Sequence, residues 1–130
     1  MRTKILLVTL LVGVFSLPSY AEELTIADGT ITTAIEGLTP VDRIESHPAG
    51  FGKLYCYTRV TGARADSQVT HVCYYQNNEM ARVNLPVRSS DWRTYSSKRF
   101  LPQWRGEWEV VVLDDNQNEI ARYPFRLVEK

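Results

Sequence analysis

Two cysteines and a histidine are the residues of this chain whose types and spacing favour a defined chemistry. Cys56 and Cys73 are the only cysteines, and His71 lies two positions before the second one. Two thiols that meet in an oxidising compartment form a disulfide. Two thiolates and an imidazole on one face of a sheet are also ligands that copper or zinc accepts. The arrangement of the strands that carry them decides between the two.

The segments around these residues have the composition of paired β-strands. Residues 54–60 and 69–75 are rich in β-branched and aromatic side chains, and residues 61–68 between them hold Gly, Asp and Ser. A hairpin centred in that loop places Cys56 directly opposite Cys73. The sequence therefore predicts a cross-strand disulfide.

The same register places Thr58 opposite His71. A buried neutral His71 that is hydrogen-bonded to the Thr58 hydroxyl needs no metal ion. We therefore expect no metal, and a metal site of Cys56, His71 and Cys73 remains the alternative.

No group of residues has the pattern of a catalytic site. Ser96 and Ser97 have no base that the sequence can assign to them, and His71 has no nucleophile near it once the cysteines are paired. The sequence therefore predicts a protein that is not an enzyme and needs no cofactor.

The outward face of the predicted three-stranded meander, residues 54–87, is the first candidate binding surface. Tyrosine offers flat apolar area with a polar tip, and arginine binds carboxylates or stacks on rings, which suits a glycan or a protein partner. The alternative is that Trp92, Trp104 or the loop at Pro48 covers this face as a second layer of core. The predicted ligand-binding residues here are Tyr55, Tyr57, Tyr74, Arg59 and Arg82.

The predicted strand at residues 92–99 is the second candidate. Arg93, Ser96 and Lys98 form a polar row that favours recognition of an anion, and Arg93 and Lys98 are its predicted ligand-binding residues. The alternative is a solvated edge strand that its charges keep from pairing with another chain.

Short strands separated by turn signals predict the fold class. About seven strands without a helical period favour an antiparallel immunoglobulin-like β-sandwich, and a small β-barrel is the alternative. Between the second and third strands of the meander we expect a three-residue loop that pairs Cys73 with Ala81. The predicted strands are residues 30–35, 54–60, 69–75, 81–85, 92–99, 108–113 and 120–128.

Residues 1–21 have the pattern of a secretory signal peptide. Arg2 and Lys4 precede an apolar run at residues 5–17, and small residues stand three positions and one position before a cleavage site after Ala21. The run is shorter than the roughly 20 residues of a membrane span. We expect cleavage, and an uncleaved anchor is the alternative.

The expected mature chain, residues 22–130, is long enough for a single domain with one core. Without Arg2 and Lys4 it has 13 basic and 15 acidic residues, a balance that does not favour a nucleic-acid or membrane-surface partner. Its middle is locally basic, since residues 52–113 hold nine basic and five acidic residues. We therefore expect a periplasmic or secreted protein with no nucleic-acid partner and no stable membrane insertion.

Several segments of the chain resemble the bacterial family called domain of unknown function 2914 (DUF2914). They are residues 34–42, 70–75 and 92–98, joined by residues 106–108 and by Phe125. The resemblance extends over nearly all of the expected mature chain. It implies an exported or membrane-tethered all-β domain and no known activity.

The chain departs from that family pattern at two positions. Cys73 stands where the family has Trp, and Cys56 stands where an aromatic residue is common. Two facing cysteines in place of two bulky core residues are consistent with a disulfide that replaces aromatic packing.

These observations predict a non-catalytic binding or accessory module that engages an envelope glycan or an envelope protein. The alternative is a periplasmic protein that handles metal ions or redox equivalents through Cys56, Cys73 and His71.

Overall fold

The computed structural model describes Gly13 and residues 23–129, so the predicted signal peptide, apart from Gly13, lies outside the described residues. The regular elements in residues 23–129 are β-strands, and no helix in that range is long and apolar enough to cross a membrane. The strands are β1 (Thr25–Thr32), β2 (Ile35–Glu36), β3 (Thr39–Pro40), β4 (Ser46–Pro48), β5 (Gly52–Thr61), β6 (Ser67–Tyr75), β7 (Asn78–Val87), β8 (Asp91–Phe100), β9 (Gly106–Leu113) and β10 (Glu119–Val128).

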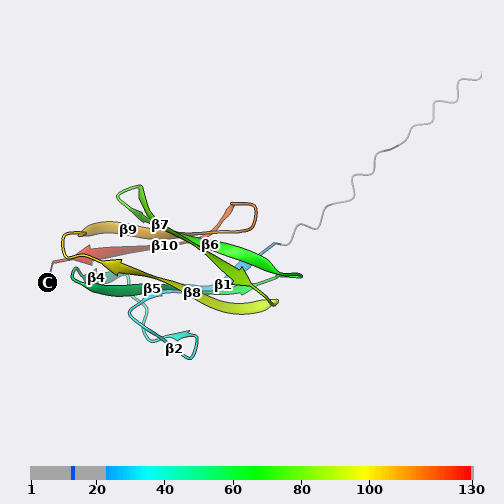
Figure 1. The fold of residues 1–130 in the computed structure, drawn as a ribbon, viewed down its shortest axis with the longest axis horizontal. Coiled ribbons are helices and arrows are strands. Elements are labelled where there is room, and N and C mark those ends of the chain that lie inside the picture. The colour runs from blue at the N-terminus through cyan, green and yellow to red at the C-terminus, as the bar shows by residue number, and fades with distance from the viewer. Residues whose placement is uncertain (1–12, 14–22, 130) are drawn as a thin grey trace, which may run out of the picture.

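Two sheets pack face to face as a sandwich (Figure 1). The three-stranded sheet has the order β1-β5-β8, and the five-stranded sheet has the order β4-β10-β9-β6-β7. Neighbouring strands are antiparallel, except that β4 runs parallel to the end of β10. Among the described strands neither sheet closes into a barrel. The predicted antiparallel immunoglobulin-like sandwich is therefore confirmed.

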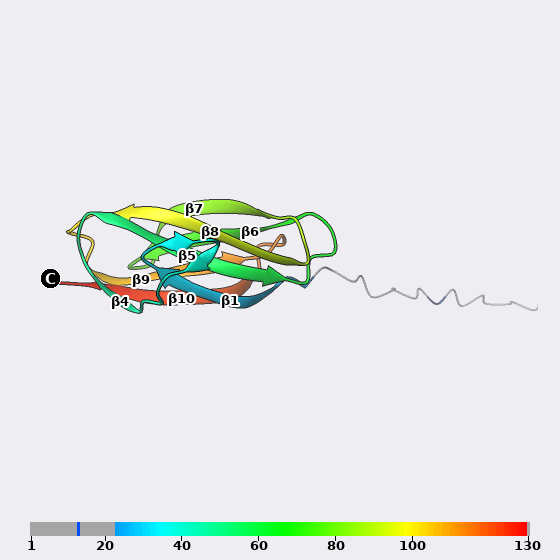
Figure 2. The same ribbon diagram turned by 90° about the horizontal axis from the view of Figure 1, so that it is seen from below.

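Six of the seven long strands lie where the sequence predicts strands, whereas β1 begins five residues before the predicted strand at residues 30–35 and ends at Thr32. Three short strands were missed. β2, β3 and β4 have only two or three residues each, too few for an alternating pattern to be recognised. β2 and β3 form a small hairpin that lies on the outer side of the three-stranded sheet, beside β5 (Figures 1 and 2).

The predicted hairpin between β5 and β6 is wrong. β5 pairs with β1 and β8, whereas β6 pairs with β7 and β9. The chain passes from one sheet to the other between Thr61 and Ser67, so the inner faces of β5 and β6 oppose each other across the core. An alternating pattern marks the buried face of a strand but not the sheet that the strand joins, and the sequence is compatible with both arrangements.

The hairpin of β6 and β7 has the predicted register, with Cys73 paired with Ala81. Its turn contains two residues with positive φ, Gln76 at 49° and Asn77 at 68°. The register shifts by one residue after Cys73, in a β-bulge. A two-residue turn and a bulge together produce the pairing that the prediction assigned to a three-residue loop.

Aromatic rings fill one half of the core. The Trp108 side chain is 2% exposed, and its ring stacks on Tyr75 with 4.4 Å between ring centroids. Phe100 meets Trp108 edge to face at 4.8 Å, and the Trp108 Nε1 donates a hydrogen bond of 2.8 Å to the Trp104 carbonyl. The other half of the core holds smaller side chains: Leu24, Val60, Ala63, Val69, Val87 and Val112.

We predict that Trp108→Ala destabilises the fold by about 3 to 5 kcal/mol, the usual cost of truncating a buried aromatic side chain. Tyr95→Ala is the control, because Tyr95 is 42% exposed and its loss should cost less than about 1 kcal/mol. Urea unfolding followed by tryptophan fluorescence and circular dichroism measures both values. Equal stability of the two variants would contradict the placement of Trp108.

Candidate functional site

The structure divides the first predicted binding surface between two opposite faces of the sandwich. Tyr55, Tyr57 and Arg59 lie on the outer side of the three-stranded sheet, because they alternate along β5 with the residues that face the core. Tyr74 and Arg82 belong to strands of the five-stranded sheet. A single patch of these five residues is therefore not formed, for the same reason that the predicted β5–β6 hairpin is wrong.

Tyr57 is buried rather than exposed. The sequence analysis gave a covered face as its alternative, but it expected Trp92, Trp104 or the loop at Pro48 as the cover, and the segment that passes over Tyr57 is a different one. The Tyr57 side chain is 3% exposed, and residues 33–45, which include the β2–β3 hairpin, pass over this side of the sheet. Asp42 connects that segment to the end of β1 by accepting hydrogen bonds from the Thr32 hydroxyl at 2.6 Å and the Thr33 amide at 2.8 Å. The hydrogen bonds from Thr32 and Thr33 lower the pKa of the Asp42 carboxyl. Neither Trp92 nor Trp104 is needed to explain the burial of Tyr57.

On the outer side of the five-stranded sheet, arginines are paired with carboxylates. Arg82 binds Glu79 at 2.7 Å, and its pKa is raised by that hydrogen bond. Arg122 binds Glu109 at 2.9 Å and also binds Glu119. Exposed pairs of this kind add little stability, but they leave few free charges on this face.

On the outer side of the three-stranded sheet, three basic residues form no salt bridge within residues 23–129. Arg59 is paired with Asp91 at 2.6 Å and Arg43 with Asp28 at 2.7 Å, so these two arginines are neutralised. The three others, which we call the basic row, are Lys53, Arg93 and Arg99.

Aromatic side chains accompany the basic row. Lys53 pairs with Arg99 in the register of β5 and β8, and Tyr55 pairs with Ser97 one step further along the outer face. Tyr55 meets Tyr95 edge to face at 6.0 Å, and Tyr95 is one of the exposed large hydrophobic residues that the structure describes. The sequence analysis missed Lys53, Tyr95 and Arg99. The sequence did contain a signal for two of them: Arg93, Tyr95 and Arg99 are separated by even numbers of residues, so they share one face of β8.

The second predicted row mixes the two faces of β8. Arg93 points outward, whereas Ser96 and Lys98 are half-buried on the inner side. Successive side chains of a regular strand point to opposite faces, so residue 93 lies on one face and residues 96 and 98 lie on the other. Lys98 therefore belongs to a different feature from Arg93.

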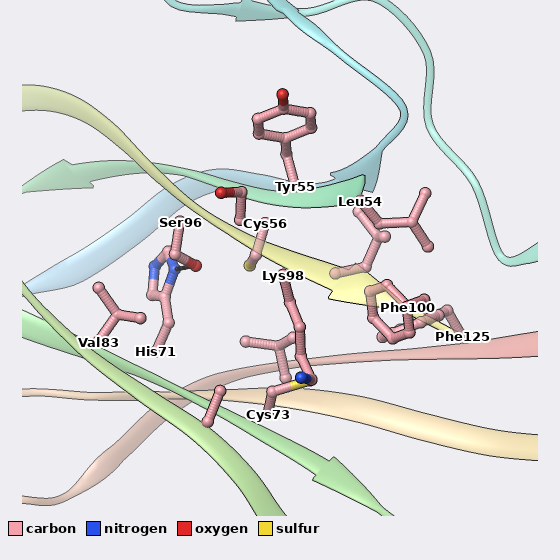
Figure 3. A pocket seen from close by; sticks show the side chains of 14 residues that line it. Leu54, Tyr55, Cys56, His71, Cys73, Val83, Ser96, Lys98, Phe100 and Phe125 are labelled. Carbon is pink, nitrogen blue, oxygen red and sulfur yellow. Dashed lines mark hydrogen bonds between the residues drawn. The ribbon is translucent and has the colours of Figure 1, made fainter. Parts of the chain in front are cut away.

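That feature is a small pocket between the sheets, at the side where β7 and β8 run beside each other (Figure 3). The cavity has a volume of about 30 Å³, enough for a water molecule but not for a sizeable ligand. Lys98 extends from β8 across it, with its Nζ 4.8 Å from the centroid of the Trp104 ring. Residues that line it include Leu54, Cys56, His71, Cys73, Val83, Ser96, Lys98 and Phe100.

His71 forms two hydrogen bonds at the wall of the pocket. Its Nδ1 lies 2.7 Å from the Ser96 hydroxyl, and its Nε2 lies 3.1 Å from the Thr58 hydroxyl. The predicted partnership with Thr58 is confirmed, although it crosses the core between two sheets. The Ser96 hydroxyl does have a histidine beside it, contrary to the prediction that no base is near.

This serine and histidine are poorly suited to nucleophilic catalysis. Burial lowers the pKa of His71 to about 4, so the ring is a weak base at neutral pH. Its far nitrogen faces the neutral Thr58 hydroxyl, where a catalytic triad has a carboxylate that stabilises the protonated ring. The geometry supports a structural role in which one neutral imidazole satisfies two buried hydroxyls.

Cys56 and Cys73 are free thiols, so the predicted disulfide is absent from the structure. The two residues belong to different sheets, and layers of a sandwich are about 10 Å apart, whereas a disulfide needs Cα atoms within roughly 7 Å. Burial raises the pKa of both thiols, that of Cys73 to about 11. Residues 23–129 contain no group of three or more His, Cys, Asp or Glu side chains that could hold a metal ion.

A wider hollow of about 500 Å³ lies at the opposite side, between β1 and β10. Tyr123 lies there against Gly29, where an added Cβ would stand 2.0 Å from the tyrosine oxygen. Arg126 at its wall is paired with Glu107, so this hollow lacks the free basic groups of the other side.

Residues 66–127 match a family model described as "Protein of unknown function (DUF2914)". The match covers 62 of the 130 residues of the chain. The match begins at the loop before β6 and runs almost to the end of β10, which confirms the resemblance seen in the sequence. Residues 34–42, which also suggested the family, lie outside the matched range.

Comparison with solved structures finds a similar fold, and comparison with curated proteins finds no match. The CARDB domain of a protein from Pyrococcus furiosus, solved in complex with di-metal ions, aligns with a TM-score of 0.51 and 12% sequence identity. The alignment covers 83% of this chain and 94% of the CARDB chain. At this identity the likeness supports the sandwich fold and nothing more.

We predict that His71 makes stability depend on pH between about 4 and 6.5. Its pKa in the folded chain, about 4, is below the ordinary value of 6.5, so the unfolded chain binds a proton more readily. The contribution is complete above pH 6.5 and is lost as the pH falls toward 4, by at most about 3 kcal/mol.

Unfolding free energies of wild type and His71→Gln across that range test this, because glutamine retains hydrogen-bonding capacity without titrating. The difference between the two proteins should shrink as the pH falls. A difference that does not change with pH would show that His71 does not titrate as a buried group.

We also predict that protein purified without reductant contains two free thiols. In denaturant both should react with a thiol reagent, whereas at pH 8 the folded protein should react slowly because both thiols are buried with raised pKa values. Failure to detect thiols in the unfolded protein would establish a disulfide and contradict the structure.

Proposed function

We propose that this protein is an exported, non-catalytic accessory module that binds an anionic protein or glycan of the cell envelope through the outer side of its three-stranded sheet. Export is proposed from the pattern of residues 1–21, which has a basic start, an apolar run and a small-residue cleavage site. The absence of a catalytic role is proposed from the low basicity of His71, which lies beside Ser96 but has the neutral Thr58 hydroxyl on its far side.

The observation that carries the proposal is the asymmetry of charge between the two outer faces. Arginines of the five-stranded sheet are neutralised by glutamates, whereas Lys53, Arg93 and Arg99 form no salt bridge in the described part of the chain. Unpaired cations on one face attract a partner with carboxylate, sulfate or phosphate groups.

The aromatic residues beside the basic row add a second element of recognition. Tyr95 and Tyr55 are in edge-to-face contact, and Leu38 of the nearby hairpin is 50% exposed. A solvent-exposed ring can stack on a sugar or pack on an apolar side chain. A surface with both rings and free cations is compatible with a glycan or a protein, and the charge limits the partner to an anionic one.

A role in metal or redox handling is the other candidate. No specific observation favours it, because the thiols of Cys56 and Cys73 are buried with raised pKa values. The metal ions of the CARDB structure belong to that protein, and its identity of 12% does not carry ligands over to this chain.

We predict that replacing the basic row weakens binding to polyanions at least about tenfold, since losing several exposed ionic contacts costs at least about 1.4 kcal/mol. The variant is Lys53→Gln, Arg93→Gln, Arg99→Gln, and the probes are poly-L-glutamate and polygalacturonate at low salt. The thermal midpoint should change little, because the three side chains are exposed at the surface.

The matched control is Arg82→Gln, Arg122→Gln, which removes basic groups from the opposite face. This control should bind the polyanions as wild type does. When an envelope extract is passed over the immobilised proteins, wild type and the control should retain a species that the triple variant of the basic row does not retain. Equal retention by all three proteins would reject the basic row as the binding site.

A further inference from the structure

We propose that β8 is a docking edge for an extended acidic polypeptide segment, which adds to the three-stranded sheet as a fourth strand. This inference rests on the proposed function and specifies its partner as a protein strand with carboxylates at alternate positions. It identifies the recognition mode as backbone pairing in addition to charge.

One side of β8 pairs with no other strand that the structure describes. Asp91–Phe100 pairs with β5 through ten consecutive positions without a register shift, and no described strand is hydrogen-bonded to its other side. Alternate residues of an edge strand direct their N–H and C=O groups outward, where they can pair with another strand. β8 contains neither a proline nor a bulge.

The other edges of the two sheets are less suited to such pairing. β7 carries Pro86, which has no N–H to donate, and β4 has three residues. β1 is interrupted by an irregularity between Ile26 and Asp28. Long, regular and free of proline, β8 is the edge that best fits strand addition.

The strand that faces β8 across the core has an incompletely buried inner side. This strand is β7, the edge of the five-stranded sheet, and its inner side chains Ala81, Val83 and Leu85 are only partly buried. The pocket between the sheets lies at this side, with Val83 and Lys98 at its wall (Figure 3). Apolar side chains of an added strand would cover this incompletely buried surface.

The basic side chains of β8 favour an acidic segment as the added strand. Arg93 and Arg99 project outward from β8, and Lys98 projects inward with its Nζ near the rings of Trp104 and Phe100. None of the three forms a salt bridge in residues 23–129, so each is available to a carboxylate of a neighbouring strand. The same charges disfavour a second copy of β8, because pairing two such strands brings cations together.

In the proposed complex the side chains of the added strand alternate between two environments. Those on the outer side carry carboxylates and lie beside Arg93 and Arg99, whereas those on the inner side are apolar and lie over the groove between β8 and β7. The expected ligand is therefore a segment in which acidic and small apolar residues alternate.

The test uses a fluorescein-labelled ten-residue peptide that alternates Glu with Val, and a second peptide of the same composition in scrambled order. Fluorescence anisotropy should show at least tenfold tighter binding of the alternating peptide. Arg93→Gln, Arg99→Gln should weaken that binding about tenfold, and Arg82→Gln should leave it within twofold of wild type.

Backbone pairing is tested separately by methylating peptide nitrogens. An added strand pairs through one of its edges, so methylation of one alternate set of amides should weaken binding at least tenfold while the other set has little effect. Hydrogen exchange should show new protection in residues 91–100 and unchanged protection in residues 78–87.

The outcomes separate this inference from the proposed function. Binding of polyanions through the basic row without preference for the alternating peptide, or with both methylated peptides equal to the parent, would overturn strand addition and leave the binding module intact. Loss of all anion binding would overturn both. A dimer of the protein through β8 at low concentration would also overturn the inference, since it assigns the edge to a second copy.

Discussion

The packing of β5 against β6 across the core is the constraint on which the rest of this structure depends. The chain leaves one sheet after Thr61 and enters the other at Ser67, so the inner residues of both strands share a single interior. The hydrogen bond between Thr58 and His71 spans the two sheets, and so does the hydrophobic cluster that contains Val60 and Val69. Because these strands occupy inner positions of their sheets, the remaining long strands are ordered on either side of them, and β8 becomes an edge.

That arrangement also explains why a histidine can be buried without a charged partner. Burial lowers the pKa of His71 and keeps its ring neutral, and its two nitrogens face the hydroxyls of Ser96 from β8 and Thr58 from β5. Three polar groups satisfy each other inside the core, and the described residues contain no buried side-chain nitrogen or oxygen that lacks a hydrogen-bond partner. A constellation that resembles part of a catalytic triad is thus explained by the packing of two sheets.

The sequence predicts the elements of this fold better than their partners. Alternation identified the inner residues of β5, β6 and β7, and it identified the register of Cys73 with Ala81. It could not reveal that β5 and β6 join different sheets, since a tight hairpin and a crossover between layers bury the same side chains. The error placed Cys56 and Cys73 on adjacent strands and joined Tyr55 to Tyr74 in one patch. The basic row was missed because Lys53 and Arg99 become neighbours only when β5 pairs with β8, a contact between distant parts of the chain.

The central claim is that the outer side of the three-stranded sheet along β8 is the binding face. Mapping amide chemical shifts of the isotopically labelled protein during titration with poly-L-glutamate tests it most directly. The account predicts that the perturbed amides are those of Asp91–Phe100 and of Lys53, with little change around Arg82 and Arg122. Perturbations centred on the five-stranded sheet, or spread evenly over both faces, would contradict it.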